Sequence, residues 1–172
     1  MAPTFFLKNI PQPKVFEDLA LRYPDLKPRS AETLLLFLRV AGDILDRIDA
    51  RMSRRHMSQG KFSVLMQLNL DLKARLSPSD LAGRIGVSRA TITGLLDGLE
   101  RAGLVRRERG LTDRRAQLVH LTPKGRKFLD DMLPGHYRRT AGLMAKLSER
   151  DRQNLTALLR KLSAGIGELE KD

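Results

Sequence analysis

Arginine is concentrated in one stretch of the chain, residues 84–115, where it outnumbers the acidic side chains by eight to four. A guanidinium group can pair with phosphate through parallel hydrogen bonds, and it keeps its charge at physiological pH. An arginine on a protruding turn can also enter the narrow, negatively charged minor groove of DNA. We expect Arg114 or Arg115 to do so, with Asp113 holding one of them through a charge-assisted hydrogen bond. The alternative is that these arginines only solvate an exposed loop.

Segment 89–102 has the pattern of a helix that could lie in the major groove. At about 100° per residue its apolar side chains fall on one narrow face, which predicts contact with a core. Those side chains are Ile92, Leu95, Leu96 and Leu99. The opposite face and its flanks carry mostly small residues and hydroxyl groups, namely Ala90, Thr91, Thr93, Gly94, Asp97, Gly98 and Arg101. Such a face can approach base edges closely, although small residues can also serve only the packing between helices.

Enzyme chemistry has little support in the sequence. The chain lacks cysteine, and its three histidines, His56, His120 and His136, are not spaced as a pair of metal ligands. It has no glycine-rich phosphate loop, and its length leaves no room for a catalytic domain. We therefore expect a protein that is not an enzyme and that carries no metal and no cofactor.

The chain is strongly basic, with a formal net charge of +12 and a sequence pI near 10.7. Such a charge favours a polyanionic partner, because binding releases counterions from phosphates. Charge alone does not choose between DNA, RNA and an anionic membrane, and it can simply aid solubility. No apolar run approaches the roughly 18 residues that span a bilayer, and the cluster at 5–7 is too short for a signal peptide. We expect a cytoplasmic protein with no membrane partner.

Two short helices joined by a tight turn are predicted at the centre of the chain. Ser77 is a candidate N-cap with Pro78 at the first helical position, which predicts a helix over 78–85. Gly86 begins the turn, and Ser88 caps a second helix that ends near Gly103. Two helices joined in this way form a helix-turn-helix, and the amides at the start of the second helix suit a phosphate.

Other elements flank this motif. Strand-like runs at 104–108 and 117–121 predict a β-hairpin. Longer helices are predicted at 30–54, 62–70, 123–147 and 148–169; Ser30, Thr122 and Ser148 are their candidate N-caps, Ser58, Gln59 and Gly60 interrupt the first two, and Pro134 is a candidate kink. Residues 1–28 hold five of the eight prolines, which predicts an extended arm with at most one short helix near 15–21. We expect this arm to lie on the body of the protein or across a partner subunit.

This order of elements predicts a mainly α fold: a winged helix-turn-helix with a small β-hairpin wing and a helical dimerisation region from both chain ends. The expected division is an arm over 1–28, dimerisation helices over 29–57 and 123–172, and a DNA-binding module over 58–122. The apolar stripes of the first and last long helices cannot both be buried within one such chain, so we expect a two-fold homodimer. Its partner would be double-stranded DNA carrying a pseudopalindromic operator.

The run LSPSDLAGRIGVSRATITGLLDGLERAGLV followed by TDRRAQLVHLTPKG resembles the MarR family of winged helix-turn-helix regulators. The wing pattern of that family is matched by Asp113, Arg115, Val119, Leu121, Thr122 and Gly125. The resemblance implies that Ala90, Thr91 and Gly94 face the bases and that Arg115, oriented by Asp113, reaches the minor groove. Many members carry a long basic or polar residue where this chain has Gly94, which puts more weight on Arg89, Thr93 and DNA shape. The DNA-contacting set that we expect is Ser77, Ser79, Ser88, Arg89, Ala90, Thr91, Thr93, Gly94, Arg106, Asp113, Arg114 and Arg115.

The resemblance also implies a small-molecule effector, because many relatives bind an aromatic or phenolic anion between the dimer helices and the winged module. The candidate contacts are Met52, His56, Met57, Phe62 and Met66, although methionine and phenylalanine at helical spacing commonly fill a core. The preferred hypothesis is a repressor that an effector releases from DNA. The alternative is an architectural protein that coats or bends DNA without a defined operator.

Overall fold

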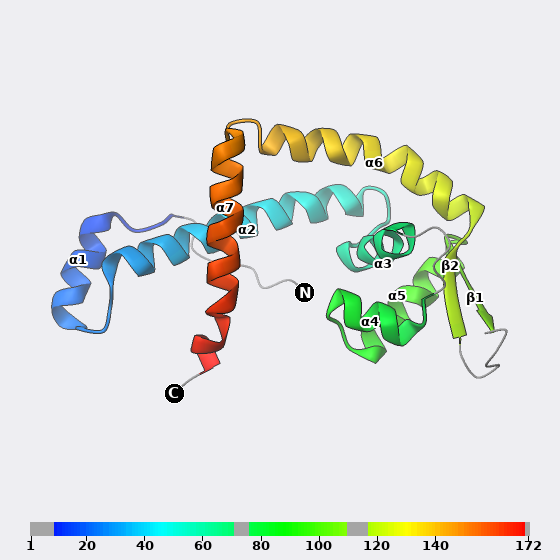
Figure 1. The fold of residues 1–172 in the computed structure, drawn as a ribbon, viewed down its shortest axis with the longest axis horizontal. Coiled ribbons are helices and arrows are strands. Elements are labelled where there is room, and N and C mark those ends of the chain that lie inside the picture. Colours follow the sequence, from blue (N-terminus) through cyan, green and yellow to red (C-terminus); the bar gives the residue numbers. More distant parts are fainter. Residues whose placement is uncertain (1–8, 71–75, 110–116, 171–172) are drawn as a thin grey trace. The chain divides into compact units, whose positions relative to one another are not determined.

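The computed structural model describes residues 9–70, 76–109 and 117–170, and these are mostly helical with one two-stranded sheet (Figure 1). In order, the elements are α1 (Pro13–Arg22), α2 (Pro28–Ser53), α3 (Gln59–Leu70), α4 (Pro78–Ile85), α5 (Arg89–Arg101), β1 (Val105–Arg109), β2 (Gln117–Leu121), α6 (Pro123–Leu143), α7 (Glu149–Ala164) and the 3-10 helix η1 (Ile166–Glu170). The chain divides into two compact units. Of the described residues, the first unit contains 9–67 and 79–98, and the second contains 68–70, 76–78, 99–109 and 117–170.

The predicted arm contains one short helix, α1, which lies against α2 in the first unit and buries Phe16. Within the described part, the arm therefore contributes one short helix that contacts α2 of the same chain. The predicted N-cap of α2 is wrong. The helix begins at Pro28 with Lys27 as its N-cap, so Ser30 lies inside the first turn. Proline's fixed φ suits the first helical position, which places the boundary ahead of the serine.

The C-terminus of α2 closes with a left-handed residue. His56 has φ +53°, and the amide of Met57 donates to the carbonyl of Met52 over 3.1 Å. This is the hydrogen bond of a Schellman motif, in which the residues on either side of the turn often make an apolar contact. Met52 and Met57 hold these two positions, and both are buried. The next helix, α3, begins at Gln59. The prediction that Gln59 and Gly60 belong to the break between the two helices is therefore wrong. Ser58 caps α3 by accepting a hydrogen bond from the amide of Lys61 over 3.3 Å.

The helix-turn-helix forms as predicted. The helix α4 spans 78–85, Gly86 takes φ +74° in the turn, and α5 begins at Arg89 directly after its cap, Ser88. Within the first unit, buried side chains come from all three helices of the motif region: Val64 and Leu65 from α3, Leu81 and Ala82 from α4, and Ile92 and Leu96 from α5. A Cβ at Gly60 would lie 3.0 Å from Leu95 Cδ2, so the start of α3 approaches α5 closely.

In the second unit, the end of α5 leads directly into the hairpin. The amide of Leu104 donates to the carbonyl of Leu99 over 3.0 Å, which ends the helix beside Gly103 at φ +71°. Because that amide closes the helix, β1 begins one residue later than predicted, while β2 has the predicted bounds. The strands are antiparallel, with pairs running from Val105 and Leu121 to Arg109 and Gln117. Leu76 adds an isolated bridge to Val119.

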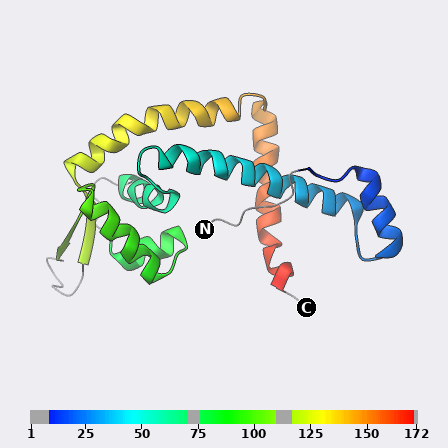
Figure 2. The same ribbon diagram turned by 180° about the vertical axis from the view of Figure 1, so that it is seen from behind.

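Helix α6 begins at the predicted cap. Thr122 Oγ1 accepts from the amide of Gly125 over 3.0 Å and donates to the carbonyl of Gly103 over 2.7 Å, which fastens the helix to the end of α5. Both ribbon views show α6 as a curved helix, and Pro134 lies inside it (Figures 1 and 2). It ends at Leu143 rather than at 147.

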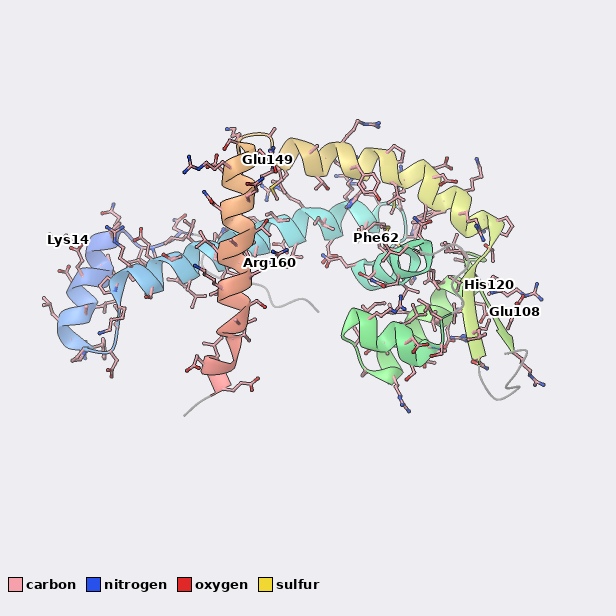
Figure 3. All side chains as sticks on the ribbon, in the orientation of Figure 1. Lys14, Phe62, Glu108, His120, Glu149 and Arg160 are labelled. Atoms are coloured by element: carbon pink, nitrogen blue, oxygen red, sulfur yellow. The ribbon has the colours of Figure 1, made fainter. Side chains whose placement is uncertain are left out.

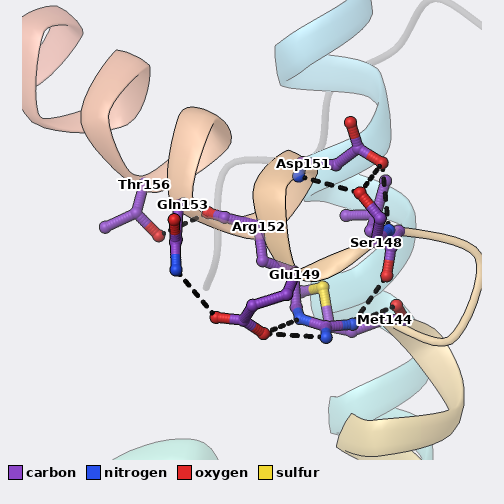
Figure 4. A network of polar contacts seen from close by, with 8 residues as sticks. Met144, Ser148, Glu149, Asp151, Arg152, Gln153 and Thr156 are labelled. Carbon is purple, nitrogen blue, oxygen red and sulfur yellow. Dashed lines mark hydrogen bonds and ion pairs between the residues drawn. The ribbon is translucent and has the colours of Figure 1, made fainter.

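Helix α7 begins at its predicted N-cap, Ser148, which forms a capping box: the Ser148 hydroxyl and the Asp151 carboxylate each accept from the other residue's amide. The guanidinium of Arg152 donates to Glu149 and to the carbonyls of Met144 and Leu147, and this network closes the corner between α6 and α7 (Figure 4). The prediction that α7 continues to 169 is wrong. The α-helix ends at Ala164, before Gly165, and a 3-10 turn follows.

Candidate nucleic-acid interface

The two faces of α5 are arranged as the sequence predicts. Ile92, Leu96 and Leu99 are at most 1% exposed, and Leu95 on the same face is half-buried, so most of the apolar face is covered. The opposite face is open to solvent along the length of the helix, at Arg89, Ala90, Thr91, Thr93, Gly94, Asp97 and Arg101. An amphipathic helix with a small, polar outer face can be approached closely by another molecule.

The start of α5 carries an N-cap with a second hydroxyl beside it. Ser88 Oγ accepts a hydrogen bond from the amide of Thr91 over 3.1 Å and lies 2.9 Å from Thr91 Oγ1. The Ser88 hydroxyl therefore serves the helix itself. The amides of Arg89 and Ala90, which have no intrahelical partner in an α-helix, remain the groups suited to an anion.

Thr93 and Gly94 occupy the middle of the outer face. The Thr93 hydroxyl donates to the carbonyl of Arg89 over 2.9 Å, so its oxygen is the group that can accept a further hydrogen bond. A Cβ at Gly94 would have no heavy atom within 4 Å, and Gly94 is not among the glycines with positive φ. Neither packing among the described residues nor backbone conformation therefore requires a glycine at 94.

One residue beside this face was not found by sequence reasoning. Lys61 reaches from the start of α3 to α5, where its Cε lies 2.9 Å and its Nζ 3.3 Å from the position that a Cβ on Gly98 would take. The two residues are far apart in the sequence, so no periodicity within either helix could have indicated the contact. The one available signal was that two glycines, Gly94 and Gly98, lie one turn apart on α5.

The hairpin joins α5 through a carboxylate. Glu100 Oε1 accepts from the backbone amide of Arg107 over 3.0 Å, and Glu100 Oε2 accepts from the guanidinium of the same residue over 3.2 Å. This contact fixes the third residue of β1 against the last turn of α5. Because both partners are only partly exposed, the contact is more than a solvated surface pair.

The other predicted hairpin residues fall in two groups. The side chain of Arg106 is 70% exposed and lies 3.8 Å from Glu108, which is also 3.6 Å from His120 on the paired strand (Figure 3). Arg106 is thus available for a partner. Asp113, Arg114 and Arg115 lie outside the described residues. At the start of α4, Ser77 is half-buried and Ser79 is exposed.

The predicted effector contacts do not share one environment. Met52 and Met57 are buried where α2 ends, Phe62 and Met66 are half-buried on α3, and His56 is exposed. The two buried methionines behave as core residues in this structure. Among the residues that the structure describes, no cluster of histidine and carboxylate side chains could hold a metal ion, and no helix is long and apolar enough to cross a membrane.

Comparison with known proteins places these features in context. Residues 57–116 match the model of the MarR family. The HTH-type transcriptional repressor YetL of Bacillus subtilis is 34% identical over 156 residues, which cover 91% of this chain and 93% of YetL. The crystal structure of a MarR-family transcriptional regulator from Silicibacter pomeroyi is 30% identical with a TM-score of 0.62, covering 78% of this chain and 89% of that chain.

A crystal structure of an S. aureus MepR–DNA complex has a TM-score of 0.68 at 21% identity, covering 77% of this chain and 94% of that chain. At this identity the likeness concerns the fold. Together with the regulator from Silicibacter pomeroyi, it confirms the predicted fold class, a mainly α winged helix-turn-helix with a small hairpin.

Proposed function

Since this chain belongs to the MarR family and is a DNA-binding transcriptional regulator rather than an enzyme, we propose that it recognises a pseudopalindromic operator as a homodimer. It would act as a repressor in the cytoplasm, where it can reach the chromosome. The name of its relative YetL, a transcriptional repressor, supports that sign of regulation.

The observation that carries the proposal is the outer face of α5. Arg89, Ala90, Thr91, Thr93 and Gly94 are all exposed on a helix whose other face buries Ile92, Leu96 and Leu99. A helix presented in this way fits the major groove, where threonine can contact base edges and the thymine methyl group. Ser88 would place the first-turn amides of α5 against a backbone phosphate, and Ser77 and Ser79 would contribute from the start of α4.

The hairpin would act as the wing. Arg106 is exposed on β1, and the sequence assigns Arg114 and Arg115 to the tip, with Asp113 orienting Arg115. Guanidinium groups at a wing tip suit the narrow minor groove beside the helix. The contact between Glu100 and Arg107 supports this role, because it ties the strand that carries Arg106 to the reading helix.

The dimer is supported by apolar surface that the single chain leaves uncovered. Helix α7 contains no buried residue and α2 contains only Met52. The exposed leucines include Leu34, Leu38 and Leu45 on α2 and Leu155, Leu159 and Leu162 on α7. Because monomeric proteins rarely expose long apolar stripes, a second copy of this chain is the proposed occupant. In this proposal the dimerisation helices are those of 29–57 and 123–172, and the DNA-binding module is 58–122.

An effector remains part of the proposal. It would be a small aromatic or phenolic anion that contacts His56, Phe62 and Met66, the three candidates with some solvent exposure. Met52 and Met57 could contribute only if the end of α2 opened, because both are buried. Protection of His56 against chemical modification by a candidate anion would support this site.

The test of the proposed function is selection of bound sequences from random duplex DNA, followed by affinity measurements on the winner and a scrambled control. A two-fold-symmetric motif bound at least about 10³ times more tightly than the control would support operator recognition. No enriched motif, together with equal affinities and a steep dependence on salt, would favour the architectural alternative. The small side chains on α5 are the one observation that favours the alternative, since they offer few groups for base recognition.

A further inference from the structure

Helix α3 meets α5 at two neighbouring places through glycine. At the first, Gly60 lies against Leu95, where a Cβ would come within 3.0 Å of Cδ2. At the second, the side chain of Lys61 lies across Gly98, with its Nζ 3.3 Å from the position of a Cβ there. A side chain at 98 and the side chain of Lys61 would therefore compete for the same space.

The direction of Lys61 follows from the geometry of α5. At about 100° per residue, Gly98 lies on the flank between Leu95, which faces α3, and Gly94, which is on the outer face. The lysine side chain thus runs from the packed side of α5 towards the side proposed to read DNA. Its ammonium lies beside Gly98, one helical turn after Gly94.

The ammonium of Lys61 has no acidic partner in the part of the chain that the structure describes. Among the described residues no acidic side chain forms an ion pair with it, whereas Arg107 on the hairpin is held by Glu100. Its backbone amide donates to the hydroxyl of Ser58, the cap of α3. A lysine that extends along a reading helix with no carboxylate partner has its ammonium available for an external anion.

We propose that Lys61 is a further DNA-binding residue, whose ammonium contacts a backbone phosphate at the edge of the groove that α5 enters. This inference rests on the proposed function of α5. An ammonium is a compact point charge without the forked geometry of arginine, so it suits a phosphate better than a base edge. Lys61 would thereby supply a positive charge from α3 beside a part of α5 where positions 94 and 98 carry no side chain.

The test compares Lys61→Met with wild type on the selected operator and on a scrambled duplex over a series of salt concentrations. Methionine keeps most of the apolar stem and removes the charge. We expect weaker binding to both duplexes by a similar factor, and a plot of log affinity against log salt whose slope is shallower by about 0.9, the loss of one phosphate contact. Lys14→Met on α1, an exposed lysine far from α5 in the same unit, should leave the slope unchanged (Figure 3).

Two further variants separate this contact from a folding effect. Lys61→Arg should keep the wild-type slope. Gly98→Ala should displace Lys61 and weaken DNA binding without lowering thermal stability, whereas Gly83→Ala, where a Cβ meets nothing within 4 Å, should leave binding unchanged.

The possible failures are distinguishable. If wild type binds neither duplex, the proposed function fails. If wild type binds and Lys61→Met has the same slope, or changes only the preferred sequence, the phosphate contact of Lys61 is wrong while the function of α5 stands.

Discussion

Gly125 shows how one missing side chain positions the hairpin. It is buried in the first turn of α6, and a Cβ there would collide with the carbonyl oxygen of Leu104. The backbone that leads into β1 can pass so close only because position 125 has no side chain. The sequence marked Gly125 as part of the wing pattern, and the structure supplies the physical reason.

We therefore expect Gly125→Ala to lower the free energy of unfolding by about 1–3 kcal/mol, the usual cost of overpacking a rigid contact. Gly142→Ala is the matched control, because it lies in the same helix and its Cβ would meet nothing within 4 Å. The control should be neutral or stabilising by up to about 1 kcal/mol. Urea unfolding of both variants decides the matter, and equal stabilities would contradict the close approach.

Gly94 presents the opposite case. A glycine inside a helix costs about 1 kcal/mol relative to alanine. No contact with a described residue and no backbone angle requires glycine at this position. Its position on the exposed face of α5 suggests that the reason lies in a partner that approaches closely.

Gly94→Ala should raise the free energy of unfolding by about 0.5–1 kcal/mol and weaken operator binding by about 1–3 kcal/mol. Thermal unfolding and DNA titrations on one protein preparation give both quantities. Gly83→Ala, an exposed glycine on α4 with similar open space, should share the first effect but not the second. Full operator affinity in Gly94→Ala would mean that the DNA does not come close at this position.

The carboxylate of Glu100 couples two elements, the reading helix and the first strand of the hairpin. Removing its charge in Glu100→Gln weakens two hydrogen bonds to Arg107, one of them to the backbone. We expect a loss of about 1 kcal/mol of stability, since both partners are partly exposed. The larger effect should be on DNA, as reduced hydroxyl-radical protection of the minor groove under the wing.

Protection of the major groove under α5 should persist in Glu100→Gln. Glu108→Gln on β1 is the control, because it removes a carboxylate from the strand that carries Arg107 and leaves Glu100 in place. If both footprints of Glu100→Gln weaken together, Glu100 does not act through the wing.

The corner between α6 and α7 should become less stable at low pH. Hydrogen bonds from Ser148 to the Asp151 carboxylate lower the pKa of Asp151, and the hydrogen bond and charge of Arg152 lower the pKa of Glu149. A carboxyl whose pKa is lower in the folded state contributes stability above its unfolded pKa, near 4, and this contribution disappears as the pH falls through the folded pKa.

We therefore expect the start of α7 to fray below about pH 4. Asp151→Asn should show a smaller dependence on pH, because only the contribution of Glu149 remains. Amide exchange at 149–152 measures the effect locally. Asp46→Asn, an exposed carboxylate on α2, should leave the acid profile of α7 unchanged. An identical profile in Asp151→Asn and wild type would show that the capping box does not control this end.

The elements show where sequence reasoning succeeds and where it fails. Local signals were sufficient wherever a cap and the helix it starts are adjacent in sequence, as for Pro78, Ser88 and the box of Ser148 with Asp151. They failed where two signals competed, since Pro28 rather than Ser30 begins α2. The position of Lys61 over Gly98 could not be predicted at all, because it depends on how closely α3 packs on α5.

The balance of charge and apolar surface in the whole molecule favours a dimer on DNA. A net charge of +12 would drive two copies apart, so association requires a compensating apolar contact. The exposed leucines of α2 and α7 are the surfaces available for it. Two-fold pairing also doubles the number of phosphate contacts, which makes dimerisation and operator affinity mutually dependent.

This dependence can be tested on α7 with one pair of substitutions. Leu159→Asp places a carboxylate in the apolar stripe, whereas Ala157→Asp places the same group on the opposite side of the helix. Losing the burial of one leucine in each subunit removes at least about 3 kcal/mol, so the dissociation constant of a Leu159→Asp dimer should rise by about a hundredfold or more. Sedimentation equilibrium measures that constant, and operator titrations should then show weaker binding for Leu159→Asp alone. A dimer unaffected by Leu159→Asp would exclude this stripe as the interface. The exposed leucines of α2 would then be the remaining apolar surface able to hold two reading helices on one operator.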